Sequence, residues 1–306
     1  MKNQIKYIGI SSLLVFLLSL TACGGKVAEG KSVTVTIEPQ RFFAEKIAGD
    51  KFAIHCVVPS GQSPETYDPT PKQMVEIGES VAYLRIGYIG FEQVWMEKIE
   101  ENNPKLKIFD VSKGMQFVKE AEVEHAHDGH EHAAGDGHHH HHAGGIDPHI
   151  WSSVEGARVI ARNMLDAFIS LDKGNADYYR KNYDDLMALI DKTGHEIRQL
   201  LEPLAGQTFI IYHPALTYFA AEFNLIQLCI EMDGKEPSPA QLKQLVTAAK
   251  ENHAKVVFIQ REFDQKNAEL IAEETGCRLV TINPLDYHWD TELIHIAKAL
   301  KDGQTD

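Results

Sequence analysis

The most unusual chemical feature of this 306-residue chain is a histidine-rich segment near its middle. It contains the runs HAHDGHEH and HHHHH among Gly, Ala, Asp and Glu, without apolar periodicity, so we expect a mobile loop and not a packed core. Neutral imidazole is the commonest protein ligand of zinc and also suits copper and nickel. A flexible loop must be ordered at each binding event, so we expect weak, rapidly exchanging metal sites. The nine histidines are His125, His127, His130, His132, His138, His139, His140, His141 and His142.

Three other residues could form a rigid metal site, and each lies in a proline-marked loop. They are Glu65 in PSGQSPETYDPTPKQM, His149 in GGIDPHIW and His213 in FIIYHPALTYFA. Each lies at the end of a predicted strand or leads into a predicted helix, which is where open α/β sheets place ligand sites. Either histidine alone could be a hydrogen-bonded core or capping residue. Together, one carboxylate and two imidazoles form a common three-ligand zinc site whose fourth position is open to water or another oxygen.

The elements that must position these residues alternate between strands and helices. The first half has strand patterns at 33–37, 52–58, 81–86 and 106–111, with helical patterns at 40–49, 71–79 and 90–101. The second half has strand patterns at 208–212, 225–228, 256–260 and 279–282, with helical patterns at 214–223, 238–251 and 265–275. Two parallel-sheet α/β lobes are therefore expected. Residues 175–201 carry apolar side chains at helical spacing, which predicts one long, rigid helix between the lobes.

The N-terminus has the pattern of an export signal. Lys2 and Lys6 precede an apolar run from Ile8 to Leu20, which is too short to span a bilayer comfortably. Cys23 follows small residues, where a bacterial lipoprotein signal places the cysteine that is acylated and becomes the new N-terminus. We therefore expect an exported protein that a lipid anchors to the membrane, facing the periplasm or the cell exterior. An ordinary secretory signal with an incidental cysteine is the alternative.

These patterns divide the chain into a signal peptide (1–22), a tether (23–31), an N-terminal lobe (32–173) that includes the histidine-rich loop (123–145), a bridging helix (174–203) and a C-terminal lobe (204–306). Removing residues 1–22, which contain two lysines and no acid, moves the formal charge from −14 to −16. Such an acidic surface argues against nucleic-acid partners and favours the attraction of cations. Cys56, Cys229 and Cys277 lack the close spacing of a thiolate metal site, and no pairing among them is predicted.

The order of these parts resembles the zinc and manganese solute-binding lipoproteins of bacterial ABC importers, the cluster A-I or TroA-like family. The resemblance covers essentially the whole mature chain and is carried by the proline-flanked loop before TPKQM, by DPHIW and by YHPA followed by an aromatic residue. It implies two lobes bridged by one helix, with the metal in the cleft between them. The implied partner is a membrane permease driven by a separate ATPase, and we expect a monomer. The histidine-rich insertion resembles zinc-type members in particular.

The resemblance also implies a ligand set, with two departures from the family pattern. His149 and His213 match the second and third ligands, whereas Glu65 occupies the place of a first histidine. The fourth position falls near Asn283, an amide and thus a poor ligand, with Asp286 three residues further on. Glu65 could instead orient an imidazole, with Asp286, Asp68 or a loop histidine completing the shell. Zn²⁺ is the expected cargo, and Mn²⁺, which prefers more oxygen ligands, is the alternative.

Two functions of other classes compete with a transport receptor. Two histidines, a carboxylate and an open position also describe a zinc-dependent hydrolase. The chain has no H-E-x-x-H or G-x-x-x-x-G-K-[ST] sequence and no identifiable general base, so we expect no enzymatic activity. A surface lipoprotein that buffers metal or acts as an adhesin, mainly through the loop, is the third possibility.

Overall fold

A computed structural model describes residues 31–118, 145–231 and 235–303 of the chain. The predicted signal peptide, Cys23 and the histidines at 125–142 lie outside the described residues. Among the described helices, none combines the length and the apolar character that a membrane span requires.

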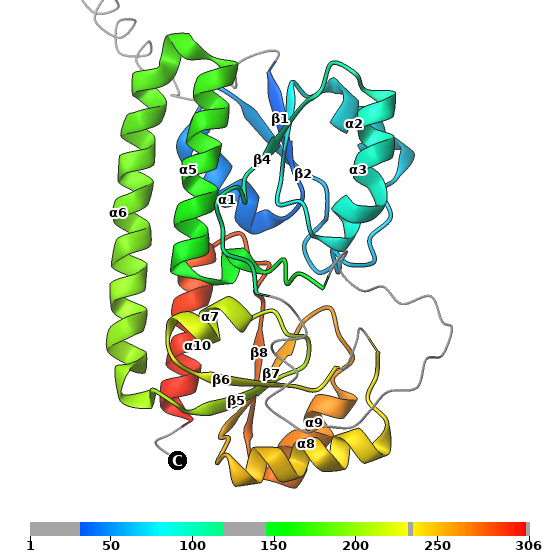
Figure 1. Ribbon diagram of the computed structural model, residues 1–306, viewed down its shortest axis with the longest axis vertical. Helices are drawn as coiled ribbons and strands as arrows, with labels where there is room; N and C mark the ends of the chain where they lie inside the picture. Colours follow the sequence, from blue (N-terminus) through cyan, green and yellow to red (C-terminus); the bar gives the residue numbers. More distant parts are fainter. Residues whose placement is uncertain (1–30, 119–144, 232–234, 304–306) are drawn as a thin grey trace, which may run out of the picture.

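The N-terminal lobe is built on a four-stranded parallel sheet of order β2-β1-β3-β4 (Figure 1). Its strands are β1 (Ser32–Val35), β2 (Ala53–Cys56), β3 (Ala82–Arg85) and β4 (Lys107–Asp110). The helices α1 (Glu38–Ala48), α2 (Pro71–Glu79) and α3 (Gly90–Asn102) connect them. Parallel neighbours require such crossovers, so the predicted alternation of strand and helix leads directly to this sheet.

The C-terminal lobe repeats the same strand order. The strands β5 (Thr208–Ile211), β6 (Ile226–Cys229), β7 (Val256–Gln260) and β8 (Arg278–Ile282) pair in parallel as β6-β5-β7-β8. The helices of this lobe are α7 (Thr217–Glu222), α8 (Pro239–Glu251) and α9 (Lys266–Thr275). The prediction of two parallel-sheet lobes is confirmed. In each lobe the direction of winding reverses between the two central strands, which opens a crevice at their carboxyl ends.

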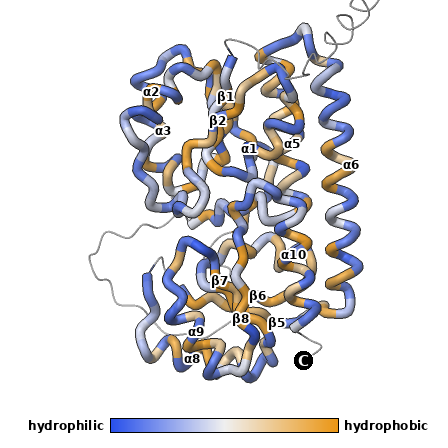
Figure 2. The backbone as a smooth tube through the Cα atoms, turned by 180° about the vertical axis from the view of Figure 1, so that it is seen from behind, coloured by the Kyte–Doolittle hydropathy of each residue, from blue (hydrophilic) through white to orange (hydrophobic). Residues whose placement is uncertain are grey.

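Long helices on one side of the molecule link the lobes. The chain passes through a short helix, η1 (Ile150–Ser152), into α5 (Val154–Leu171) and then through η2 (Lys173–Asn175) into α6 (Ala176–Leu201). Helix α6 runs beside both lobes (Figure 1), and its buried apolar residues alternate with polar ones along the tube in Figure 2. The predicted bridging helix is confirmed. The final helix, α10 (Trp289–Asp302), was not predicted and packs against α6.

Aromatic side chains join the two lobes beside this helical layer. The Trp289 ring of α10 packs on Phe43 of α1 with 5.2 Å between the ring centroids. The Trp289 indole N–H donates to the backbone oxygen of Trp151 at 2.6 Å, and the Trp151 N–H donates to the backbone oxygen of Pro284 at 3.0 Å. Both buried indoles therefore satisfy their donors across the lobe boundary. One hydrophobic core continues from the N-terminal lobe into α10, which favours a fixed arrangement of the lobes.

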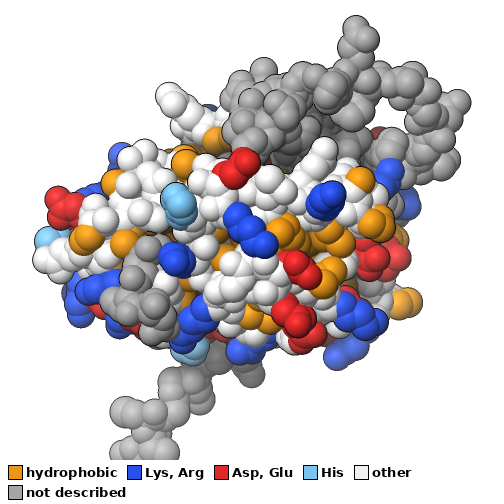
Figure 3. Space-filling model, turned by 90° about the horizontal axis from the view of Figure 1, so that it is seen from below, with side chains coloured by type: hydrophobic (Ala, Val, Ile, Leu, Met, Phe, Trp, Pro, Cys, Tyr) orange, Lys and Arg blue, Asp and Glu red, His pale blue; other side chains and the backbone are white. Residues whose placement is uncertain are grey.

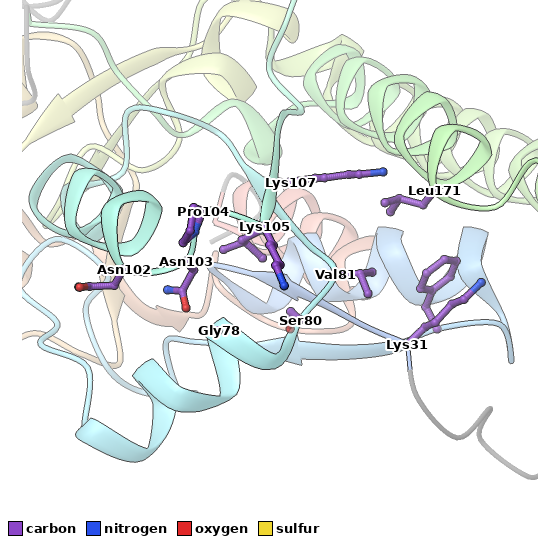
Figure 4. A pocket seen from close by; sticks show the side chains of 12 residues that line it. Lys31, Gly78, Ser80, Val81, Asn102, Asn103, Pro104, Lys105, Lys107 and Leu171 are labelled. Carbon is purple, nitrogen blue, oxygen red and sulfur yellow. The ribbon is translucent and has the colours of Figure 1, made fainter.

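Two surface features lie away from the predicted ligands. A cavity of about 590 Å³ opens at the amino ends of the N-terminal lobe strands (Figure 4), and its lining includes Lys31, Lys105 and Lys107 but no His, Cys, Asp or Glu among the described residues. It therefore lacks the side chains that bind transition metals. On the face seen in Figure 3, basic and acidic side chains are interspersed, without a continuous basic track.

Candidate metal site

All three residues of the predicted rigid site line one small cavity between the lobes. The cavity is enclosed by side chains from the loop after β2, from the segment before α5 and from three loops of the C-terminal lobe. Its lining residues are Ser63, Pro64, Glu65, His149, Trp151, His213, Ala215, Glu262, Phe263, Pro284 and Leu285. The fold thus brings Glu65, His149 and His213 together from positions up to about 150 residues apart in sequence.

The Asp147 carboxylate fixes the ring of His149. Its Oδ1 accepts hydrogen bonds from the backbone N–H of His149 and from the ring Nδ1, both at 2.8 Å. Burial opposes ionisation of Asp147, but the contacts with His149 prevail and lower the pKa of this carboxyl. An ionised acceptor at Nδ1 holds the proton there and leaves Nε2 as a lone pair that can bind a metal. The DPHIW motif therefore contains both the predicted ligand His149 and the residue that orients its ring.

The Glu231 carboxylate orients His213 in the same way from the C-terminal lobe. Its Oε2 lies 3.0 Å from His213 Nδ1, and both side chains are largely buried. Burial alone would lower the pKa of the His213 imidazole, but the hydrogen bond and the charge of Glu231 raise it above its usual range. The Phe263 ring stacks on the imidazole at 5.3 Å between centroids and limits its rotation.

The two imidazoles direct their remaining nitrogens at one point. Nε2 of His149 and Nε2 of His213 lie 3.2 Å apart. With both Nδ1 atoms committed to carboxylates, two lone pairs would face each other unless a cation lies between them. Two nitrogens bound to one tetrahedral zinc at about 2.0–2.1 Å are separated by about 3.3–3.4 Å. The observed spacing fits a shared zinc ion, and at low pH a proton can take its place.

Glu65 approaches this pair from the N-terminal lobe, where α3 begins. Its Oε2 accepts a hydrogen bond from the backbone N–H of Gly90 at 3.0 Å, and Phe91 N–H donates to the Pro64 oxygen at 2.8 Å. The amino end of a helix stabilises a carboxylate, so the first turn of α3 holds the Glu65 side chain in place. A Cβ atom on Gly90 would lie 2.6 Å from the Glu65 backbone oxygen and 2.8 Å from its Cα. Only glycine lets the loop approach this closely.

The two candidates for the fourth ligand position, Asn283 and Asp286, bond to each other beside the cavity. Asn283 donates from its side chain to Asp286 Oδ2 at 3.0 Å, and its backbone N–H donates to Glu292 at 2.7 Å. Neither Asn283 nor Asp286 belongs to the lining of the cavity as the structure describes it. Their neighbours Pro284 and Leu285 line it instead.

Sequence reasoning missed Glu262, which does line the cavity. Burial raises the pKa of its carboxyl, whereas the nearby His213 and His149 act in the opposite direction. A signal was available, because Glu262 follows β7 by two residues and His213 follows β5 by two residues. The pairing of β5 with β7 was needed to use that signal. Asp147 and Glu231 were also missed as orienting groups.

Tyr218 holds the segment that carries His149. Its hydroxyl donates to the Asp147 backbone oxygen at 2.7 Å and accepts from the Val118 N–H at 3.1 Å. This side chain of α7 therefore ties the loop that carries His149 to the C-terminal lobe. The described cysteines take no part, since Cys56, Cys229 and Cys277 do not belong to the cavity lining.

Comparisons with known proteins identify the family of this chain. The model of the family described as zinc-uptake complex component A, periplasmic, matches residues 33–293. The zinc uptake protein ZnuA of Bacillus subtilis is 28% identical over 293 residues, covering 92% of this chain and 89% of the relative. The manganese ABC transporter lipoprotein PsaA of Streptococcus anginosus is 25% identical, covering 87% and 86%.

A solved structure extends the likeness to three dimensions. A crystal structure of ZnuA superposes with a TM-score of 0.79 at 34% identity, covering 90% of this chain and 99% of that chain. The laminin-binding protein Lmb of Streptococcus agalactiae, at 22% identity and a TM-score of 0.74, shares the fold. The chain belongs to the zinc-uptake component A family, the extracytoplasmic substrate-binding components of metal ABC importers, which are receptors and not enzymes.

Proposed function

We propose that this chain captures Zn²⁺ in the cleft between its lobes, through Glu65, His149 and His213, and delivers it to the permease of an ABC importer. The observation that carries the proposal is the imidazole pair, whose Nε2 atoms lie 3.2 Å apart while carboxylates hold both Nδ1 atoms. Such carboxylate–histidine pairs fix the tautomer and raise the basicity of a metal ligand. A hydrolase has no support from the family, whose members are receptors.

Capture would involve a small closing movement. Among the described residues, no three His, Cys, Asp or Glu side chains are spaced to hold an ion as they stand. The imidazoles already have ligand spacing, so the carboxylate side must move toward them. The continuous core and α6 oppose a wide hinge rotation, and the loop that carries Glu65 can shift locally. Release to the permease would reverse that local shift.

Zinc is the proposed cargo, and manganese is the alternative. Two imidazoles favour a metal toward the high-affinity end of the divalent first-row series, such as zinc. Manganese lies at the low end and prefers carboxylate and water oxygens in an octahedral shell. The relatives include zinc proteins and manganese proteins, so the cargo of this chain requires a direct measurement.

The remaining parts complete the proposed receptor. Acylation at Cys23 would hold a monomeric chain at the membrane surface near its permease, with the separate ATPase acting from the other side. The nine histidines of the 125–142 segment would gather metal weakly and raise its concentration near the cleft.

Deletion of residues 125–142 tests the division of labour between cleft and loop. We expect the deleted chain to keep one tightly bound zinc per molecule while its low-affinity capacity falls, and a His149→Ala chain to show the opposite. Competition titration with a chromogenic chelator, combined with metal analysis, measures both. Loss of tight binding on loop deletion would refute the cleft site and favour a buffering protein.

A further inference from the structure

Glu262 lies just beyond the carboxyl end of a central strand of the C-terminal lobe. Strands β5 and β7 are the central pair of their sheet, with Ile211 beside Phe258 in parallel register. His213 lies two residues beyond the end of β5, and Glu262 lies two residues beyond the end of β7. The two side chains therefore emerge on either side of the crevice where winding reverses, the place where open α/β sheets bind ligands.

The backbone that carries Glu262 is fastened to His213 from two sides. Gln260 donates from Nε2 to the His213 backbone oxygen at 2.7 Å and accepts from the His213 N–H at 3.3 Å. Phe263 stacks on the imidazole with an interplanar angle of 24°. Glu262 lies between these two anchors, so the position of its backbone relative to His213 is set by the fold and not by a free loop.

The surroundings of this carboxylate suit a cation. Glu262 lines the same cavity as Glu65, His149 and His213. Among the described residues, no lysine or arginine forms an ion pair with it, although burying an uncompensated carboxylate is costly. The ionisable groups that act on it are the two histidines of the site. A divalent ion between the imidazoles would provide the missing compensation.

We infer that Glu262 supplies the fourth donor to the captured ion and limits how strongly the site discriminates against manganese. This inference rests on the proposed cleft site and extends it. Two imidazoles and two carboxylates neutralise a divalent cation within the cavity. The set also provides more oxygen than the three predicted ligands alone, and oxygen is what manganese prefers.

The substitution Glu262→Gln tests whether this carboxylate binds the captured ion and whether it matters more for manganese than for zinc. In Glu262→Gln the side chain keeps its size but loses its charge, so zinc affinity should fall on the order of 10- to 100-fold, as for other perturbed metal shells. Manganese affinity should fall further, because a larger share of its binding depends on oxygen donors. Competition titrations with each metal measure this ratio, and visible spectra of the Co²⁺-loaded chain report a change in its coordination. Glu273→Gln, an exposed charge change on α9, is the matched control.

The outcomes are distinct. Reduced zinc affinity, a larger loss for manganese and an altered Co²⁺ spectrum in Glu262→Gln, with Glu273→Gln unchanged, support the inference. Normal affinities and an unchanged spectrum overturn it, and a corresponding loss in Asn283→Ala would then assign the fourth donor there. His213→Ala serves as the reference, because unaltered zinc binding in that variant would refute the proposed cleft site itself. Thermal unfolding of each apo variant detects misfolding.

Discussion

The two lobes share one strand order, yet they use the carboxyl ends of their central strands differently. In the N-terminal lobe the crevice between β1 and β3 is filled by the lobe's own Glu92, which is only 2% exposed. Its carboxylate accepts hydrogen bonds from the Thr36 hydroxyl and from the N–H groups of Ile86 and Gly87. The polar groups at this crevice are therefore satisfied within the lobe.

In the C-terminal lobe the equivalent crevice carries His213 and Glu262, and both line the cavity between the lobes. The Glu231 carboxylate holds Nδ1 of the His213 imidazole, so the other ring nitrogen, Nε2, points toward His149. One topology thus gives a closed polar cluster in the first lobe and an open one in the second. The N-terminal lobe contributes Glu65, from an outer loop seated on α3, and His149, from the segment before α5. The comparison predicts that metal binding depends most on the C-terminal crevice.

The largest effect expected from this comparison follows from releasing His213. Glu231→Gln should weaken zinc binding about 10- to 100-fold, because the ligand loses its orienting carboxylate. Glu231 also raises the pKa of His213, so protons compete with the metal as pH falls through that raised value. The variant should therefore begin to lose zinc at a lower pH than the wild type. Zinc titrations between about pH 5.5 and 8 measure this shift. If Glu231→Gln begins to lose zinc at the same pH as the wild type, or if the control Glu251→Gln shifts that pH equally, Glu231 does not have the orienting role assigned to it.

A smaller effect is expected from the N-terminal contribution. Gly90→Ala places a Cβ atom against the backbone of Glu65 and should push its loop away from the imidazoles. We expect a loss of zinc affinity on the order of tenfold, with no shift in the pH at which binding is lost. Gly174→Ala is the control, since a Cβ atom there meets only Asp172 Oδ1 at 3.7 Å. If Gly90→Ala binds zinc normally, the loop that carries Glu65 is only a wall of the cavity.

The smallest effect on metal binding is expected at Glu92, where stability should change instead. Burial raises the pKa of this carboxyl to about 7. The folded state then holds the proton more tightly than the unfolded state, so its contribution to stability is greatest below about pH 4.3 and declines as pH rises toward 7. Glu92→Gln should remove this slope and lower the free energy of unfolding by about 1–3 kcal/mol at pH 5.

Urea unfolding of the apo chain between about pH 5 and 8 measures the slope, with the exposed Glu97→Gln on α3 as control. Zinc affinity should stay within about threefold of the wild type, because Glu92 is not part of the cavity lining. A large loss of affinity in Glu92→Gln would show that the closed crevice also takes part in metal capture.

Much of the architecture was predictable, because strand and helix periodicities are local. Residues 71–79 were expected to be helical and form α2, and residues 256–260 were expected to be extended and form β7. The bridging helix followed from its apolar stripe, which includes Leu186, Ile190 and Ile197. Helix α10 was missed although Leu293, Ile296 and Leu300 are buried at helical spacing.

The site was only partly predictable, because its missing members depend on contacts between distant segments. Glu65, His149 and His213 were found through their motifs, and the structure places all three in one cavity. Glu231 contacts His213 only because β6 pairs with β5. Glu262 lies near His213 only because β7 pairs with β5. No local pattern in a single sequence reveals those pairings.

Zinc X-ray absorption spectroscopy on the mature chain, loaded with one equivalent of zinc, tests the central claim most directly. We predict a shell of two imidazoles and carboxylate oxygens at about 2.0–2.2 Å, and the loss of one imidazole in His213→Ala. A shell of three or more imidazoles that His213→Ala leaves unchanged would place the tightly held ion in the histidine-rich segment and contradict the cleft site.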